Sequence, residues 1–229
     1  MTNKIINIVL AFSLAAAVSA CSMGPYYEAP DEPEYNGILT ERSVTDLVTI
    51  KRSPEGTVFL QYGRFKLLPE ELAFERQRRV MAQMTVFPQM EGEYYKCKVD
   101  WIEQLEEGRF LYAQAGAKAP AGDGLDIILG SEYTRVDDGY LSVHYLTWWG
   151  GQTVHHDFDL IAGLYPDDPY ALVLVQDSNS DARESKSEGM VCFDINDLPP
   201  TGGETRTITL YWTELDGTTG KLNFGFKTR

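Results

Sequence analysis

The chain has 229 residues, of which 34 are Asp or Glu and 20 are Lys or Arg, so its net charge is −14 at pH 7. Such an acidic chain repels phosphate backbones and anionic head groups, which argues against a nucleic-acid partner. It contains no Gly-x-Ser-x-Gly elbow, phosphate-binding loop, dinucleotide fingerprint or His-Glu-x-x-His zinc motif. We therefore expect a protein that is not an enzyme.

The first 20 residues have the layout of a signal peptide. A single lysine, Lys4, precedes an apolar stretch that runs from Ile5 to Val18. A retained transmembrane helix needs about 20 apolar residues, and this stretch is shorter and is followed by Gly24 and Pro25. We expect residues 1–20 to be removed from the mature protein.

The residues that end this segment resemble the lipobox of bacterial lipoproteins, with an aliphatic residue, two small residues and a cysteine: Val18, Ser19, Ala20 and Cys21. The resemblance implies that a signal peptidase recognises the first three residues and cuts before Cys21, whose thiol carries a diacylglyceryl group. Several buried acyl chains, at about 0.8 kcal/mol per methylene, hold a protein on a membrane. An ordinary signal peptide that happens to precede a cysteine is the alternative.

Residues 21–43 are expected to form a tether behind the lipidated cysteine. They carry Pro25, Pro30 and Pro33 among acidic residues and tyrosines. This composition favours an extended chain without a core of its own. The tether would lift the folded part off the membrane.

Residues 44–118 are expected to form a small OB-like barrel. Runs rich in Val, Phe, Tyr and Thr are separated by glycine turn signals and predict five strands, at 44–51, 57–62, 64–69, 79–88 and 93–102. Between the third and fourth runs, the segment from Pro69 to Arg78 predicts a short helix, because it starts with proline and two early glutamates. Five short strands with one small helix suit an OB-like barrel.

Residues 124–229 are expected to form an antiparallel β-sandwich, after a Gly- and Ala-rich connection. Alternating residues on either side of Gly150-Gly151 predict a hairpin over 140–161, with Val143 opposite Phe158. The last hairpin needs an odd loop of three or five residues to pair its apolar residues: Ile208 with Phe226, Leu210 with Phe224, and Trp212 with Leu222. The predicted fold class is therefore all-β.

Two cysteines remain if Cys21 is lipidated, and they are Cys97 and Cys192. An exported, oxidising setting permits a disulfide between them. They fall in different expected domains, and a bridge needs their Cα atoms within about 7 Å. Two separate buried thiols are the alternative.

All three histidines lie in the segment 140–161. The hairpin register sets His144 opposite Asp157 with His155 on the same face, so these three residues could hold an ion such as zinc in a metal-dependent hydrolase. Exposed His–Asp pairs without metal are the alternative, and we expect no cofactor other than the lipid. His156 is expected in the core, with a hydrogen bond.

Two adjacent tryptophans end the strand before Gly150, and adjacent strand residues point to opposite sides. The register buries Trp149 and turns Trp148 outward, where its indole is a possible contact for a sugar ring or a partner protein. Packing of Trp148 under a neighbouring loop is the alternative.

Four segments together resemble the NigD-like lipoproteins of Bacteroidetes-type bacteria, at 78–102, 137–161, 171–195 and 207–227. The resemblance implies an OB-like domain followed by a β-sandwich, anchorage to the outer membrane on its periplasmic or surface face, and no catalytic residues. Immunity to a bacteriocin has been proposed for some members. We expect a non-enzymatic lipoprotein that binds a protein or glycan partner. A carbohydrate-binding lipoprotein of a glycan-uptake system and the metal-dependent hydrolase are the alternatives.

Overall fold

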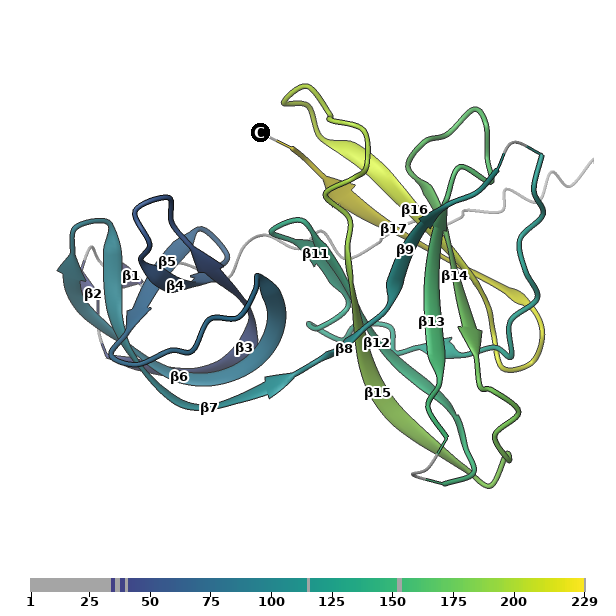
Figure 1. Ribbon diagram of the computed structural model, residues 1–229, viewed down its shortest axis with the longest axis horizontal. Helices are drawn as coiled ribbons and strands as arrows, with labels where there is room; N and C mark the ends of the chain where they lie inside the picture. The colour runs from purple at the N-terminus through teal and green to yellow at the C-terminus, as the bar shows by residue number, and fades with distance from the viewer. Residues whose placement is uncertain (1–33, 36–37, 40, 115, 152–153, 229) are drawn as a thin grey trace, which may run out of the picture.

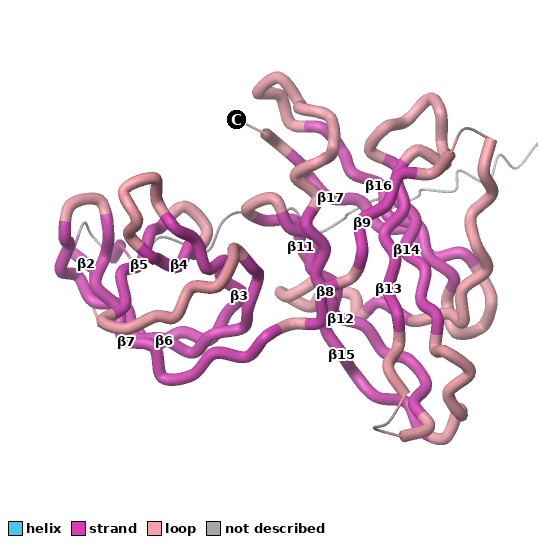
Figure 2. The backbone as a smooth tube through the Cα atoms, in the orientation of Figure 1, coloured by secondary structure: helices cyan, strands magenta, loops and turns pink. Residues whose placement is uncertain are grey.

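The computed structural model describes residues 34–35, 38–39, 41–114, 116–151 and 154–228. Every regular element in these residues is a β-strand, as Figure 2 shows, so no helix with the length and apolar character for crossing a bilayer occurs among them. The expected signal peptide, Cys21 and most of the expected tether lie outside the described residues. Within the expected tether, β1 (Glu34–Tyr35) pairs with β2 (Ile38–Leu39).

The first domain is a closed barrel of five strands, which confirms the predicted all-β fold class with its small barrel. Its strands are β3 (Arg42–Arg52), β4 (Val58–Tyr62), β5 (Phe65–Pro69), β6 (Arg78–Glu91) and β7 (Tyr94–Gln104). They follow the order β3-β4-β5-β7-β6 around the barrel, and β5 and β7 are parallel. Side chains pointing inward form a core that includes Val48, Leu60, Leu67, Met84 and Cys97.

The helix expected from Pro69 to Arg78 is absent. β5 ends at Pro69, β6 begins at Arg78, and residues 70–77 form an irregular connection. Leu72 and Phe74 both pack on the barrel core, although residues two apart lie on different faces of a helix. A segment this short makes too few backbone hydrogen bonds to repay helix nucleation, so packing of these two side chains decides its path.

The second domain is a sandwich of two five-stranded sheets. The first sheet contains β8 (Glu106–Glu107), β10 (Asp126–Ile127), β11 (Arg135–Asp137), β12 (Tyr140–Trp149) and β15 (Ser185–Asp194). The second contains β9 (Arg109–Tyr112), β13 (Asp157–Ala162), β14 (Ala171–Asp177), β16 (Arg206–Thr213) and β17 (Thr219–Phe226). Their inner faces share one core, which includes Leu141, Leu160, Leu172, Phe193 and Leu210.

The chain enters the sandwich before residue 118, where the sequence placed the end of the barrel domain. β8 pairs in parallel with β15 of the first sheet, and β9 pairs in parallel with β13 of the second. The segment 106–112 therefore adds an edge strand to each sheet. Runs of two and four residues are too short for alternation to identify them in the sequence.

The hairpin predicted over 140–161 does not form, because β12 and β13 lie in different sheets. β12 pairs with β15 along its whole length, while β13 pairs with β14. Val143 and Phe158 therefore belong to one core cluster as residues of facing sheets, not as a pair on one ladder. Alternation showed which residues face inward, but it fits any partner strand of the same pattern.

The last hairpin has the predicted odd loop. Thr213 faces Thr219, which leaves the five residues 214–218 between β16 and β17. Ile208 faces Phe224 instead of Phe226, so the register differs by two residues from the predicted one. A shift of two keeps every side chain on its own face of the sheet, and the apolar face was therefore assigned correctly.

Buried charged pairs join the barrel to the sandwich, which lie side by side in Figure 1. Arg79 Nη2 of β6 lies 2.8 Å from Asp137 Oδ2 of β11, and Arg135 Nη1 of β11 lies 2.8 Å from Asp46 Oδ1 of β3. The side chain of Arg79 is 0% exposed and that of Arg135 is 2% exposed. An apolar cluster spans the same junction, with Leu47, Met81, Leu105 and Cys192. Each domain thus supplies one buried arginine to a carboxylate of the other.

Candidate functional site

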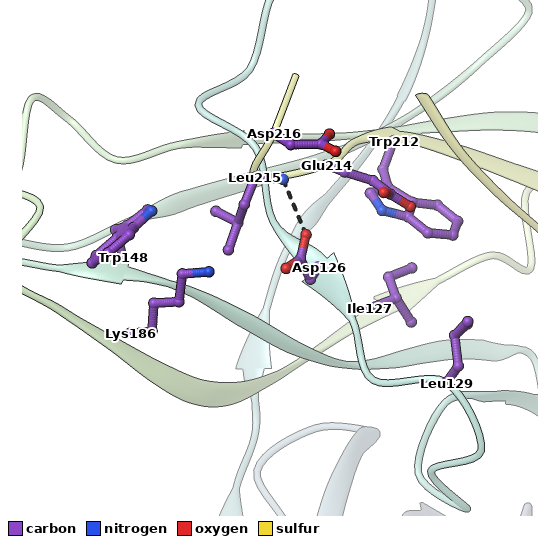
Figure 3. A pocket seen from close by; sticks show the side chains of 9 residues that line it. All are labelled: Asp126, Ile127, Leu129, Trp148, Lys186, Trp212, Glu214, Leu215 and Asp216. Atoms are coloured by element: carbon purple, nitrogen blue, oxygen red, sulfur yellow. Dashed lines mark hydrogen bonds between the residues drawn. The ribbon is translucent and has the colours of Figure 1, made fainter. Parts of the chain in front are cut away.

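A cavity of about 370 Å³ lies at one edge of the sandwich, where the loop after β16 approaches β10 (Figure 3). We call it the Trp148 cavity. Its walls come from both sheets and from the loop, and they are formed by Asp126, Ile127, Leu129, Trp148, Lys186, Trp212, Glu214, Leu215 and Asp216. Aromatic, apolar and charged side chains therefore converge on one small space.

Backbone hydrogen bonds set the shape of the loop 214–218. The N–H of Glu214 donates to the carbonyl of Thr218 at 2.8 Å, and the N–H of Gly217 donates to the carbonyl of Glu214 at 2.9 Å. Gly217 has a φ of 85°, a conformation that favours glycine. The N–H of Leu215 donates to Oδ1 of Asp126 at 3.0 Å, which ties the loop to β10 (Figure 3). These bonds shape the cavity wall from the chain's own backbone and carboxylate groups.

Three carboxylates and one ammonium group line the Trp148 cavity, and they belong to Asp126, Glu214, Asp216 and Lys186. The hydroxyl of Thr218 donates to Oδ1 of Asp216 at 2.6 Å, and the backbone N–H of Thr218 donates to the same oxygen at 2.8 Å. These hydrogen bonds lower the pKa of Asp216, so this carboxyl is ionised at neutral pH. Carboxylates therefore outnumber cations around the cavity.

Trp212 brings a buried aromatic ring to the cavity wall. Its side chain belongs to the sandwich core, and the residue is only 4% exposed. Its Nε1 has no hydrogen-bond partner among the residues that the structure describes. In Figure 3 the nitrogen-bearing edge of this indole is on the side where Asp126 and Leu215 lie. The Nε1 atom is itself buried, so Trp212 contributes its ring to the cavity wall and not an accessible donor.

Trp148 is half-buried. It therefore lies between the two arrangements considered from the sequence, an outward indole and an indole packed under a neighbouring loop. It faces Lys186 across the β12–β15 ladder, and the Lys186 ammonium lies 5.2 Å from the centre of the indole. Figure 3 shows Lys186 extending below Trp148 toward Asp126. The indole is thus partly packed and still contributes to the cavity. Its role as a ligand contact stays a prediction.

Trp149 points to the other side of β12, where its ring stacks on His156 at 3.9 Å between centroids and 10° between planes. His156 is only 1% exposed. Gln176 Nε2 donates to its Nδ1 at 2.8 Å, and Asp181 Oδ2 lies 3.2 Å from its Nε2. These partners place the proton on Nε2 and leave Nδ1 as an acceptor. The expected core histidine with hydrogen bonds is confirmed.

The predicted metal ligands are not brought together. His144 lies in the first sheet, with Nδ1 2.9 Å from the Ser131 hydroxyl and Nε2 3.2 Å from Glu188, whereas Asp157 begins β13 in the second sheet. His155 lies 3.9 Å from Asp157, and its side chain is 66% exposed. Within the described part of the chain, no three His, Cys, Asp or Glu side chains are placed to share an ion. The prediction was wrong because it rested on the β12–β13 hairpin.

Cys97 and Cys192 are free and buried, so the disulfide that an oxidising setting would permit is not formed. Cys97 lies in the barrel core, and Cys192 lies in the apolar cluster at the domain junction. Burial raises the pKa of each thiol to about 12. The alternative of two separate buried thiols is the one that the structure confirms.

Most of the cavity lining could not be predicted from the sequence. Trp148 was found from its position before a glycine turn, but Lys186 and Asp126 reach it from distant strands through β12–β15 and β12–β10 pairing. The only local signal was the odd length of the loop around Asp216-Gly217. That signal identified the loop without identifying what it approaches.

Comparisons with known proteins agree with this architecture. The model of the NigD-like C-terminal beta sandwich domain family matches residues 121–226. The comparison with curated proteins finds no match.

Three solved structures of similar fold come from Parabacteroides and Bacteroides species. A candidate toxin-related protein from Parabacteroides distasonis is 22% identical, with a TM-score of 0.65, and the match covers 81% of this chain and 94% of that one. A NigD-like immunity protein from Bacteroides caccae is 15% identical, with a TM-score of 0.55 and coverages of 81% and 97%. A candidate lipoprotein from Bacteroides fragilis is 13% identical, with a TM-score of 0.54 and coverages of 82% and 99%. At these identities the likeness shows the fold alone.

The two kinds of comparison address different parts of the chain. The family model covers the sandwich, and the structural matches extend beyond it into the barrel domain. Residues 121–226 form a NigD-like C-terminal β-sandwich domain, and over this part of the chain the predicted resemblance to the NigD-like proteins is confirmed.

Proposed function

We propose that this chain is a non-enzymatic lipoprotein of the outer membrane that binds a partner through the Trp148 cavity. The cavity carries the proposal, because its volume of about 370 Å³ lies within the usual range of small-ligand sites. Its lining contains no serine, threonine, cysteine or histidine, so a serine- or cysteine-type hydrolase centre is not formed there. Its size and its mixed apolar and polar lining support the binding of a small partner.

The membrane anchor in this proposal is a lipid on Cys21, attached as residues 1–20 are removed. It is supported by the residues that precede Cys21 and by the fold shared with the candidate lipoprotein from Bacteroides fragilis. Wild type and Cys21→Ala would be expressed in a Bacteroidetes host, and their membranes would be washed with salt and carbonate. We expect wild type to stay in the outer-membrane fraction and Cys21→Ala to leave it. Retention of the variant would remove the lipid anchor from the proposal.

A glycan partner, as for a carbohydrate-binding lipoprotein of a glycan-uptake system, is the first candidate for the cavity. A protein partner, as in bacteriocin immunity, is the second. Leu129, which stands at the cavity and is 70% exposed, is accessible to such a partner. One solved structure of the same fold is described as a NigD-like immunity protein.

Photo-crosslinking in intact cells tests whether the cavity binds any partner. A benzophenone amino acid would replace Leu129, and Trp148→Ala would then be added. Trp101→Ala is the matched control, because Trp101 is another tryptophan, 41% exposed, on the barrel. We expect a discrete adduct that is lost with Trp148→Ala and kept with Trp101→Ala. The same adducts in all three proteins would show that partner binding occurs elsewhere.

A further inference from the structure

We infer that the ligand of the Trp148 cavity is an uncharged pyranose sugar, as a unit of a neutral glycan. This inference rests on the proposed function, since it names the chemical class of the partner that the cavity binds. Three observations carry it: the excess of carboxylates, the two indoles, and the hydrogen bonds that fix two of the carboxylates in the wall.

The charges of the cavity exclude an anionic ligand. Three carboxylates face one ammonium group in the lining. A phosphate, a sulfated sugar or a uronic acid would bring further negative charge to this site, and like charges at short distance repel. The chain as a whole carries a net charge of −14 and adds to this repulsion.

A positively charged side chain of a protein is a poor fit for the face of Trp148. The ammonium group of Lys186 already lies 5.2 Å from the centre of the Trp148 ring, where a ligand cation would gain its attraction to the aromatic face. A second cation at this place would meet the charge of Lys186, and only the carboxylates would attract it elsewhere in the cavity. A neutral ligand can use the aromatic face without this repulsion.

The hydrogen-bonding groups match the hydroxyls of a sugar. Each carboxylate oxygen can accept from a hydroxyl, and the Lys186 ammonium can donate to one. Oδ1 of Asp126 is held by the Leu215 N–H and Oδ1 of Asp216 by Thr218, so these carboxylates are fixed before a ligand arrives. Such pre-organised polar groups reduce the entropy lost on binding.

The aromatic groups match the carbon skeleton of a sugar. The indole of Trp148 offers an apolar surface to the C–H face of a pyranose ring, and Leu215 and Ile127 supply further apolar wall. Trp212, which lines the cavity and is 4% exposed, adds a second aromatic ring to this wall. An apolar face edged by acceptors and donors is the arrangement that a pyranose presents.

Affinity electrophoresis with purified protein lacking residues 1–21 tests the inference. The gels would contain neutral polysaccharides, such as mannan, galactan, xylan and glucan, or the anionic polygalacturonate and dextran sulfate. Wild type, Trp148→Ala and Trp101→Ala would be compared, with circular dichroism to verify the fold of each. Asp126→Asn is a second cavity variant. It removes the negative charge, while its amide oxygen can still accept the hydrogen bond from the Leu215 N–H.

We expect wild type and Trp101→Ala to be retarded by at least one neutral polysaccharide and by neither anionic polymer. Trp148→Ala and Asp126→Asn should weaken this binding by about tenfold or more. Retardation by the anionic polymers alone, or equal binding by wild type and both cavity variants, would overturn the inference. If no polysaccharide binds while the adduct from position 129 is still lost with Trp148→Ala, the sugar is wrong and the proposed function stands. If the adduct also fails to depend on Trp148, both are wrong.

Discussion

Arg79 of the barrel and Asp137 of the sandwich form a buried ion pair across the domain junction, with Nη2 and Oδ2 2.8 Å apart. The arginine side chain is 0% exposed and the aspartate side chain 17% exposed. Removing one partner of a buried pair leaves the other charge without compensation. The junction is therefore a place where a single substitution should affect the stability of both domains.

Asp137→Ala should lower the free energy of unfolding by about 3 kcal/mol, because Arg79 keeps its charge in a buried site. Chemical denaturation followed by circular dichroism would measure this loss. Arg206→Ala is the control, since its pair with Glu204 is exposed and should contribute less than about 0.5 kcal/mol. Equal losses in the two variants would show that the junction pair is no more important than a surface pair.

Gly220→Ala should disturb the cavity wall. A Cβ at Gly220 would lie 2.1 Å from Cε2 of Trp212, whose ring is held in the core, whereas a Cβ at Gly225 in the same strand meets nothing closer than 3.6 Å. We expect Gly220→Ala to cost about 1–3 kcal/mol of stability and Gly225→Ala less than about 0.5 kcal/mol. Thermal unfolding of both variants measures the difference, and a cost shared equally by the two would contradict the close packing of Trp212.

The carboxyl of Asp181, which contacts His156, should make the free energy of unfolding depend on pH. The N–H of Gly150 foremost, and then His156 and the N–H of Ala182, hydrogen-bond to Asp181 and lower its pKa. A carboxyl with a lowered pKa stabilises the fold above its unfolded pKa of about 3.9, and this contribution is lost as the pH falls through the folded pKa.

Asp181→Asn should therefore be less stable than wild type at pH 7, and the gap should narrow below about pH 4 as the wild-type carboxyl becomes protonated. Denaturation curves at several pH values would measure the gap. A gap that stays constant from pH 7 to pH 3 would mean that the charge of Asp181 does not contribute to stability.

Both described cysteines should be inert in the folded protein. Burial raises the pKa of Cys97 and of Cys192 to about 12, and the reactive species is the thiolate. A chain lacking residues 1–21 should react with a thiol reagent at pH 8 only after denaturant is added. It should also migrate identically with and without reductant. Rapid labelling of either thiol in the native protein would contradict its burial.

The sequence predicted what depends on local pattern. All five barrel strands were placed within a few residues, because turn glycines separate runs such as that around Cys97, where buried and exposed residues alternate. The odd loop of the last hairpin followed from the apolar residues on its two arms. The two arms of the last hairpin are also neighbours in the sheet, and finding the barrel strands did not require knowing their partners.

What depends on distant pairing could not be predicted. The partner of β12 is β15, about 40 residues away, so Trp148 faces Lys186 and not a residue of β13. The metal hypothesis for His144 and Asp157 failed for the same reason. The expected helix failed because tertiary packing of Phe74 outweighed a weak local preference. The cavity combines four segments that are distant in the sequence, and among its residues only Trp148 was predicted as a ligand contact.

The central claim is that Trp148 and Trp212 form one sugar-binding site, and the chain contains four tryptophans that report on it separately. Two-dimensional NMR of the ¹⁵N-labelled protein without residues 1–21 would follow the four indole N–H signals during titration with neutral oligosaccharides. We predict that the signals of Trp148 and Trp212 shift together and saturate with one dissociation constant, while that of Trp101 does not move. Unchanged Trp148 and Trp212 signals across the neutral sugars, or an equal shift at Trp101, would contradict the claim.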